Sequence, residues 1–199
     1  MASEMPRIVG RRPIFKGWNA IEIVTVEAVD RKGQTRRHER EVINHGDASV
    51  VLTVDRERKV AILVRQWRAP LIGPGRDPFL LEACAGIIDP GESPDQSARR
   101  EAEEEIGLKV GALRKVGTVV PSAGTLTERM HLFIAEVSAA DRTEDGGGKP
   151  SEGEDIEVVE IPLAELYERA RRGEIDDAKT LILVQRLMIE DLGAAGPAA

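Results

Sequence analysis

Four glutamates crowd the end of one helical segment, where a helix tolerates negative charge least. The segment PDQSARREAEEEI, residues 94–106, holds Glu101, Glu103, Glu104 and Glu105 in its last turn and a half. An ordinary surface helix carries its acids near the start and its bases near the end, because the helix dipole favours that order. The reversed order therefore needs a specific explanation.

Two of these glutamates, Glu101 and Glu105, have no basic partner three or four residues away within the helix, whereas Glu104 is four residues from Arg100. Both border a narrow apolar stripe, made of Ala98, Ala102 and Ile106. The ordinary interpretation is a solvated acidic face, but carboxylates beside a packing face have raised pKa values or destabilise the fold unless a cation neutralises them. Two hard oxygen ligands one turn apart suit Mg²⁺ or Mn²⁺.

The residues at both ends of this segment predict where the helix begins and ends. Ser93 is a suitable N-cap, and Gln96 completes a capping box with it. Gly107 suits the left-handed residue that follows a helix. The sequence therefore predicts a helix over 94–106.

The chain before the helix predicts a close approach of backbone to the glutamates. Gly86 ends an apolar stretch, and its missing side chain lets the carbonyl of Ala85 come near. Asp89-Pro90-Gly91 forms a turn, after which Glu92 is expected to orient the loop or to brace Arg100. We expect the Ala85 carbonyl to lie on the same side as the helix carboxylates.

The stretch from Gly86 to Leu108 resembles the complete Nudix box, since Gly86, Glu92 and the run REAEEEIGL fill its fixed positions. That family hydrolyses a nucleoside diphosphate linked to another moiety, with Mg²⁺ or Mn²⁺ bound to the helix glutamates. The resemblance implies that the metal ligands include Glu101, Glu105 and the carbonyl of Ala85. It implies Glu104 as a further catalytic candidate.

The likeness extends over nearly the whole chain to the sugar-nucleotide pyrophosphatases of that superfamily, with the GDP-mannose pyrophosphatases first and the ADP-ribose pyrophosphatases next. It implies that Glu154 joins the metal site when a lid loop closes, and that Glu152 is the alternative base or ligand. The substrate-binding residues that it implies are Trp18, Arg40, Glu41, Arg68, Ala85, Gly86, Glu128 and Lys179.

Each of these substrate contacts also has a plainer interpretation. Trp18 is expected to stack on the base, or else to cover the apolar face of a hairpin. Arg68 is expected to contact the diphosphate or sugar, or else to form a surface ion pair. Arg40 and Glu41 are expected to reach the substrate of a partner subunit, or else to be the charges of a solvated edge strand that discourages aggregation.

The apolar patterns predict the elements that position these residues. Strands 21–29 and 35–43 form a hairpin that cannot be stable alone. Further strands are expected at 49–54, 60–66, 80–88, 116–120, 131–137 and 156–161, helices at 163–172 and 177–190, and a lid loop at 138–152. The resemblance implies an α+β fold, a Nudix-type α/β/α sandwich around a mixed sheet. Its expected parts are a hairpin element (1–44) exchanged across a homodimer, the catalytic domain (45–192) and a flexible tail (193–199).

Composition excludes several classes of function. The net charge is −7 without a dense basic run, which argues against nucleic-acid binding. No apolar run approaches the ~20 residues of a membrane span. The single cysteine, Cys84, fits a core position in a reducing compartment, and we expect a cytoplasmic protein. The three histidines lack metal-ligand spacing.

The resemblance to the sugar-nucleotide pyrophosphatases implies an enzyme that uses Mg²⁺, or alternatively Mn²⁺, to hydrolyse a nucleoside-diphosphate sugar. The expected substrate is GDP-mannose, giving GMP and mannose 1-phosphate; the alternative is ADP-ribose, giving AMP and ribose 5-phosphate. A sensor that binds a nucleotide without cutting it is a remote alternative, because all the carboxylates of the motif are present. Hydrolysis of nucleoside triphosphates is disfavoured by the N-terminal hairpin.

Overall fold

The computed structural model describes residues 5–75 and 77–194, except for the side chains of Glu152 and Ala194. Its contacts divide the chain into two compact units. The first holds the chain up to Asp47 together with Val120–Arg129, and the second holds Ala48–Val119 together with the chain from Met130 onward. Among the helices of the described residues, none is both long and apolar enough to span a membrane.

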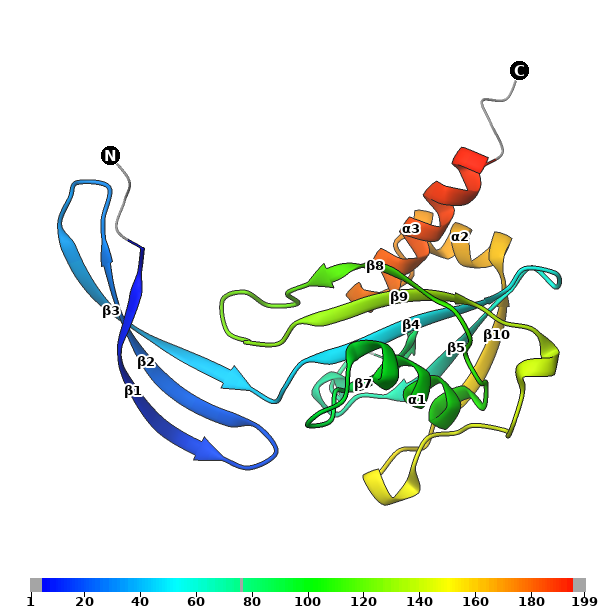
Figure 1. Cartoon of the computed structure of the whole chain (residues 1–199), viewed down its shortest axis with the longest axis horizontal. Coiled ribbons are helices and arrows are strands. Elements are labelled where there is room, and N and C mark those ends of the chain that lie inside the picture. Colours follow the sequence, from blue (N-terminus) through cyan, green and yellow to red (C-terminus); the bar gives the residue numbers. More distant parts are fainter. Residues whose placement is uncertain (1–4, 76, 195–199) are drawn as a thin grey trace. The chain divides into compact units, whose positions relative to one another are not determined.

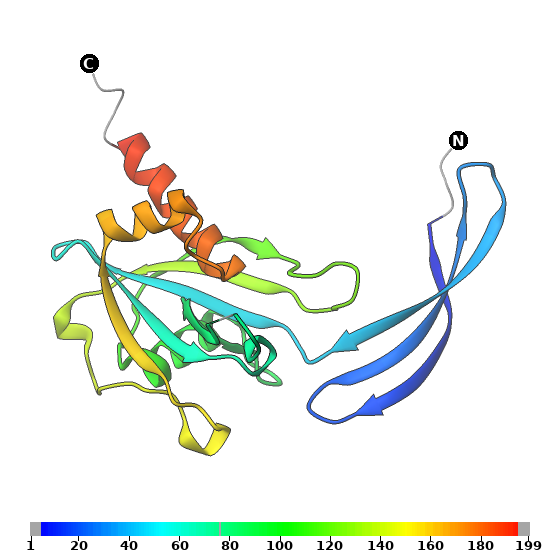
Figure 2. The same cartoon turned by 180° about the vertical axis from the view of Figure 1, so that it is seen from behind.

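The first unit is built on a three-stranded antiparallel sheet of order β1-β2-β3. Its strands are β1 (Arg7–Lys16), β2 (Ala20–Val29) and β3 (Thr35–Asn44). The predicted hairpin is β2 and β3, whereas β1 was not predicted. Its sequence, RIVGRRPIFK, contains a glycine and a proline, and its pairing with β2 is irregular on either side of them, so no clean alternation marks it as a strand. Figure 2 shows the three strands as a twisted ribbon.

The second unit contains a seven-stranded mixed sheet, in which β4 runs parallel to β9 and all other pairs are antiparallel. The path β10-β5-β4-β9-β8 is extended by β6 beside β5 and β7 beside β4. The strands are β4 (Ala48–Asp55), β5 (Val60–Trp67), β6 (Phe79–Glu82), β7 (Cys84–Ile87), β8 (Leu113–Val119), β9 (Met130–Glu136) and β10 (Glu157–Pro162).

Helices cover both faces of this sheet, which confirms the predicted α/β/α sandwich (Figure 1). On one face α1 (Pro94–Ile106) buries its apolar stripe against strand residues such as Val51 and Phe133. On the other face α2 (Leu163–Arg172) and α3 (Ala178–Ala194) pack against alternate residues such as Val50 and Leu52. Strand β4 is buried along its whole length, including its polar residues Ser49 and Thr53, because both faces of the sheet are covered.

The largest differences from the predicted boundaries lie in the run 80–88 and at the end of α3. The run 80–88, expected as one strand, divides at Ala83 into β6 and β7, because the first half pairs with β5 and the second with β4. Helix α3 continues to Ala194, so the first two residues of the predicted tail 193–199 are helical, and residues 195–199 lie outside the described residues. The lid loop contains two short 3₁₀ turns, at Ala139–Asp141 and Pro150–Glu152.

Candidate functional site

Helix α1 has the ends that its sequence predicts. The side chain of Ser93 accepts a hydrogen bond from the amide of Gln96, and the Gln96 side chain accepts one from the amide of Ser93. Gly107 is left-handed, with φ of 68°, and its amide donates to the carbonyl of Glu103. These caps fix where the helix begins and ends, and so which side chains face the sheet.

Glu101 lies against Gly86 of strand β7. A Cβ at position 86 would fall 1.9 Å from the Oε1 atom of Glu101, so only glycine leaves space for the carboxylate. The side chain is 8% exposed, and burial raises the pKa of Glu101 to about 7. A buried carboxylate with a raised pKa is the anion that a bound cation would stabilise.

Glu105 is the more deeply buried of the two carboxylates, at 1% exposed. Its Oε2 accepts a hydrogen bond of 3.0 Å from the amide of Ala85. Burial, followed by the nearby charge of Glu101, raises the pKa of Glu105 to about 8. The backbone amide of Ala85 thus contacts Glu105, and the role of the Ala85 carbonyl as a metal ligand stays a prediction.

Arg100 connects the loop before the helix with the glutamates. Its guanidinium donates to both carboxylate oxygens of Glu92 at 3.0 Å, which confirms the predicted brace, and to Glu104 at 3.0 Å. It also donates to Glu101 at 2.6 Å. Glu101 has no basic residue three or four positions away in the helix and is instead paired with its neighbour in sequence, Arg100.

The lid loop is attached to the C-terminal end of α1 through its glycines. The amides of Gly147 and Gly148 donate to the carbonyls of Glu105 and Glu104, at 2.9 and 3.0 Å. The Lys149 ammonium forms an ion pair with Glu104 at 2.5 Å. A cation and two backbone donors thus offset the dipole at a helix end that lacks basic residues.

Glu154, which the resemblance implies as a further metal ligand, lies within electrostatic range of the two helix carboxylates. Its negative charge contributes to raising the pKa of both Glu101 and Glu105. Its Oε2 accepts a hydrogen bond of 2.8 Å from the amide of Lys149, which fixes the side chain within the lid. The side chain of Glu152, the alternative base or ligand, lies outside what the structure describes.

The residues around Glu101 fit a hard divalent cation. The buried carboxylates of Glu101 and Glu105 are oxygen ligands of the kind that Mg²⁺ and Mn²⁺ prefer. Within residues 5–75 and 77–194, however, no three His, Cys, Asp or Glu side chains form a ready metal-binding group. Two carboxylates leave positions for water and substrate oxygens.

A second group of charges joins β5, β6 and α3. Arg68 donates through Nε and Nη2 to the two oxygens of Glu82, at 2.7 and 2.9 Å, and Lys179 donates to Glu82 as well. Lys179 also bonds Asp177 at 2.9 Å. The structure thus brings together two of the predicted substrate contacts, Arg68 and Lys179, through a carboxylate that was not singled out. A glutamate inside the apolar run 80–88 is the sequence signal for it.

The first unit brings together two others of the predicted contacts. The Trp18 ring stacks on His45, with centroids 5.2 Å apart, and His45 Nε2 lies 3.3 Å from a carboxylate oxygen of Glu128. The sequence assigned no chemistry to His45. Arg40 and Glu41 are exposed neighbours on β3, where the Nη1 of Arg40 donates to the carbonyl of Glu39. The structure does not group them with Trp18.

Known proteins resemble this chain over most of its length. Residues 44–184 match the model of the NUDIX domain. The GDP-mannose pyrophosphatase of Cronobacter sakazakii is 42% identical over 170 residues, which cover 85% of this chain and 87% of that protein. The one from Klebsiella pneumoniae is 38% identical over 186 residues, covering 93% and 92%. A crystal structure of an ADP compounds hydrolase covers all of both chains with a TM-score of 0.72 and 22% identity, which supports the fold.

Proposed function

Because this chain belongs to the Nudix hydrolase family, we propose that it hydrolyses the diphosphate of a nucleoside-diphosphate sugar, with GDP-mannose as substrate. The observation that carries the proposal is the pair of buried carboxylates, Glu101 and Glu105, held against the backbone of β7. The relatives named GDP-mannose pyrophosphatase support the choice of sugar nucleotide. The expected products are GMP and mannose 1-phosphate.

The proposed cofactor is Mg²⁺, with Mn²⁺ as the alternative. Glu101, Glu105 and the carbonyl of Ala85 would hold it, and Glu154 would join them from the lid. When bound, the cation neutralises charge on phosphoryl oxygens and lowers the pKa of a water ligand. Removal of divalent cations with a chelator should stop turnover, and added Mg²⁺ should restore it.

The chain's own residues would bind the diphosphate and accept the proton of the attacking water. We assign diphosphate binding to Arg68 and Lys179, whose cations already lie together on Glu82. We assign the proton acceptor to Glu154, because Glu104 is engaged by Arg100 and Lys149. A carboxylate that is already bound by two cations is a poor base.

Recognition of the base and sugar is assigned to the first unit, within a homodimer. Trp18 is 75% exposed and stacks on His45, so its exposed ring can receive a nucleobase. The Nδ1 of His45 is buried without a hydrogen-bond partner in the described part of the chain, which leaves it for a ligand or water. Arg40, Glu41 and Glu128 are assigned to the remaining substrate contacts.

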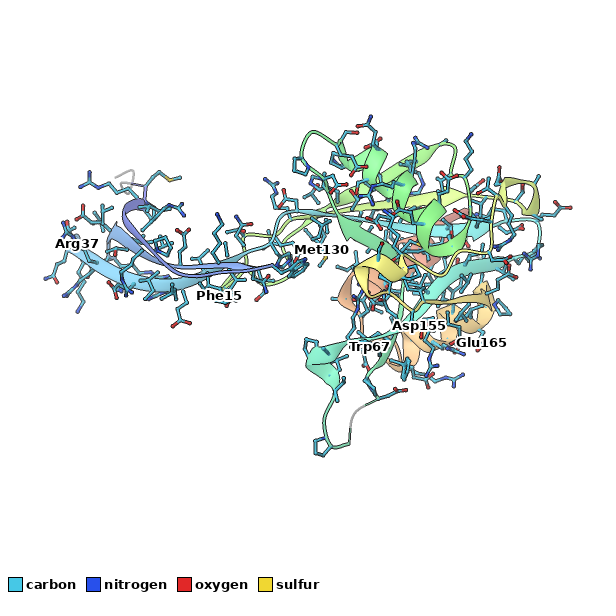
Figure 3. The ribbon with its side chains drawn as sticks, turned by 90° about the horizontal axis from the view of Figure 1, so that it is seen from below. Phe15, Arg37, Trp67, Met130, Asp155 and Glu165 are labelled. Atoms are coloured by element: carbon cyan, nitrogen blue, oxygen red, sulfur yellow. The ribbon has the colours of Figure 1, made fainter. Side chains whose placement is uncertain are left out.

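The apolar side chains of β1 support the proposed dimer. Ile8, Ile14 and Phe15 are about half exposed, and Phe15 is labelled in Figure 3. An exposed apolar strand is the kind of surface that a second chain covers. Sedimentation at several protein concentrations tests this, and a monomer throughout would remove the assignment of Arg40 and Glu41 to a partner's substrate.

A substrate panel with product identification tests the function. It contains GDP-mannose, ADP-ribose, other GDP- and ADP-sugars and a nucleoside triphosphate, each with Mg²⁺. The proposal expects the highest kcat/KM with GDP-mannose. A preference for ADP-ribose would keep the metal ligands and the mechanism but remove the choice of sugar nucleotide. No hydrolysis of any member would favour the nucleotide sensor.

A further inference from the structure

Glu82 is a buried carboxylate at a position where an apolar side chain would cost less free energy to bury. It lies at the end of β6, is 1% exposed, and is surrounded by residues of the apolar run 80–88. Replacing a buried ion pair by apolar residues of similar volume is often neutral or stabilising, so such a pair is weak evidence of a purely structural role. The buried charge of Glu82 therefore indicates a role other than stabilising the fold.

Glu82 binds two cations from distant parts of the chain. Both of its oxygens accept from Arg68, which is 40% exposed at the end of β5, and Lys179 of α3 donates to the same carboxylate. This fork engages Nε and Nη2 of Arg68, so Nη1 is the nitrogen that Glu82 does not engage. The carboxylate holds the pKa of Lys179 above its ordinary value despite burial. Both side chains therefore stay cationic.

The position of this cluster is fixed from a second direction. Asp177 caps the start of α3 by accepting from the amide of Thr180 at 3.0 Å, and its other oxygen accepts from Lys179. The hydroxyl of Thr180 accepts from the amide of Ala83 at 2.7 Å, next to Glu82 in the chain. These hydrogen bonds connect Glu82 through α3 to Ala83, the next residue in the chain. Glu82 and Lys179 therefore have little freedom to move apart.

The cluster lies within electrostatic range of the metal-binding candidate Glu105. The Glu105 charge stabilises the cation of Arg68, and the Glu82 charge is one of those that raise the pKa of Glu105. Two cations beside the carboxylates suit the oxygens of a diphosphate, because a guanidinium fork and an ammonium both bind phosphate groups. Arg68 could not keep this orientation without its bidentate partner.

We propose that Glu82 is a positioning residue, which clamps the Arg68 guanidinium and the Lys179 ammonium side by side so that they bind the substrate's diphosphate as one preassembled unit. The inference rests on the proposed function, since it names how that site holds its substrate. Glu82 itself does not touch the substrate. Its effect passes through Arg68 and Lys179.

The test is Glu82→Gln, which keeps the size of the side chain and removes its charge. We expect KM for GDP-mannose to rise by roughly tenfold to a hundredfold, the cost of misplacing a binding group, while kcat changes much less. The matched control is Asp191→Asn on α3, which removes the charge of another carboxylate that accepts two bonds from an arginine, Arg56. Both kinetic constants should stay unchanged in the control.

A double variant shows whether the effect passes through Arg68. Arg68→Ala alone should raise KM, and adding Glu82→Gln should raise it by less than Glu82→Gln does in the wild type, because only the part that passes through Lys179 remains. Independent effects would overturn the inference, as would an unchanged KM in Glu82→Gln. If Glu82→Gln does not fold, Glu82→Asp keeps the buried charge but shortens its reach. A raised KM in that variant supports the clamp, and a fall in kcat alone contradicts it.

Direct binding separates this inference from the proposed function. If the wild type hydrolyses neither GDP-mannose nor ADP-ribose, the proposed function fails. Calorimetric titration with inorganic pyrophosphate then tests the clamp without turnover. Weaker binding to Glu82→Gln than to the wild type and to Asp191→Asn supports it, and equal binding to all three overturns it.

Discussion

The carboxylate of Glu101 occupies the space that a side chain at Gly86 would need. A Cβ built on Gly86 falls 1.9 Å from Oε1 and 2.1 Å from Cδ of Glu101, well inside van der Waals contact. The glycine of strand β7 and the glutamate of the helix are therefore packed against each other. A side chain at position 86 would force Glu101 to move.

Gly86→Ala should consequently impair activity by displacing Glu101 from the backbone of β7. We expect kcat/KM to fall by about a hundredfold, the effect of a displacement of about 1 Å in a catalytic group. The Mg²⁺ concentration for half-maximal activity should rise at the same time. The control is Gly111→Ala, where a Cβ meets nothing within 4 Å. Full activity of Gly86→Ala at unchanged Mg²⁺ demand would contradict the role of Glu101.

Glu105→Gln should abolish most turnover while the fold is retained. Loss of one metal-binding carboxylate is expected to lower kcat by roughly a hundredfold to a thousandfold, the range found when one charge-stabilising group is removed from an active site. Glu190→Gln is the matched control, since Glu190 pairs with Arg114 and Arg186 on the outside of α3. Wild-type turnover in Glu105→Gln would remove its assignment as a metal ligand.

The metal-free protein should lose stability as the pH rises from about 4.5 to about 8. Burial raises the pKa of Glu101 to about 7 and that of Glu105 to about 8, from an ordinary value of 4.5. In this window the folded state binds more protons than the unfolded state, so the free energy of unfolding falls with rising pH. Thermal unfolding in a chelator, at a series of pH values, measures this.

The same measurement on Glu105→Gln isolates the contribution of Glu105. The variant should lose the upper part of the pH dependence, between about 7 and 8. It should also unfold at a higher temperature than the metal-free wild type at pH 8, because no buried charge remains at position 105. Identical pH profiles for the two proteins would show that Glu105 does not titrate in this range.

Glu154→Gln should reduce kcat and leave thermal stability nearly unchanged. The charge of Glu154 reaches both helix carboxylates, whereas its structural contact is a single hydrogen bond from the amide of Lys149, which a Gln oxygen can also accept. Glu144→Gln changes an exposed glutamate of the same lid and serves as the control. An equal kcat in Glu154→Gln and Glu144→Gln would contradict the assignment of Glu154 as the proton acceptor. Glu104 or Glu152 would then be the candidate.

The sequence by itself determined helix α1 and the spacing of the carboxylates on it. The capping box of Ser93, the left-handed Gly107 and the four-residue spacing of Glu101 and Glu105 depend on neighbours within one or two turns. Local geometry follows from local sequence, so this part of the site could be predicted residue by residue. The apolar runs likewise predicted most of the strands.

Only the tertiary structure decided which distant residues meet. Glu82 and Lys179 are 97 positions apart, and no local pattern relates them. The same holds for His45 and Glu128, whose partnership depends on the pairing of Ile43 with Leu126 beside them. Strand β1 was missed because its own sequence shows no clean alternation. It is a strand because it pairs with β2. Contacts of this kind depend on how the strands pair and the helices pack, which no short stretch of sequence encodes.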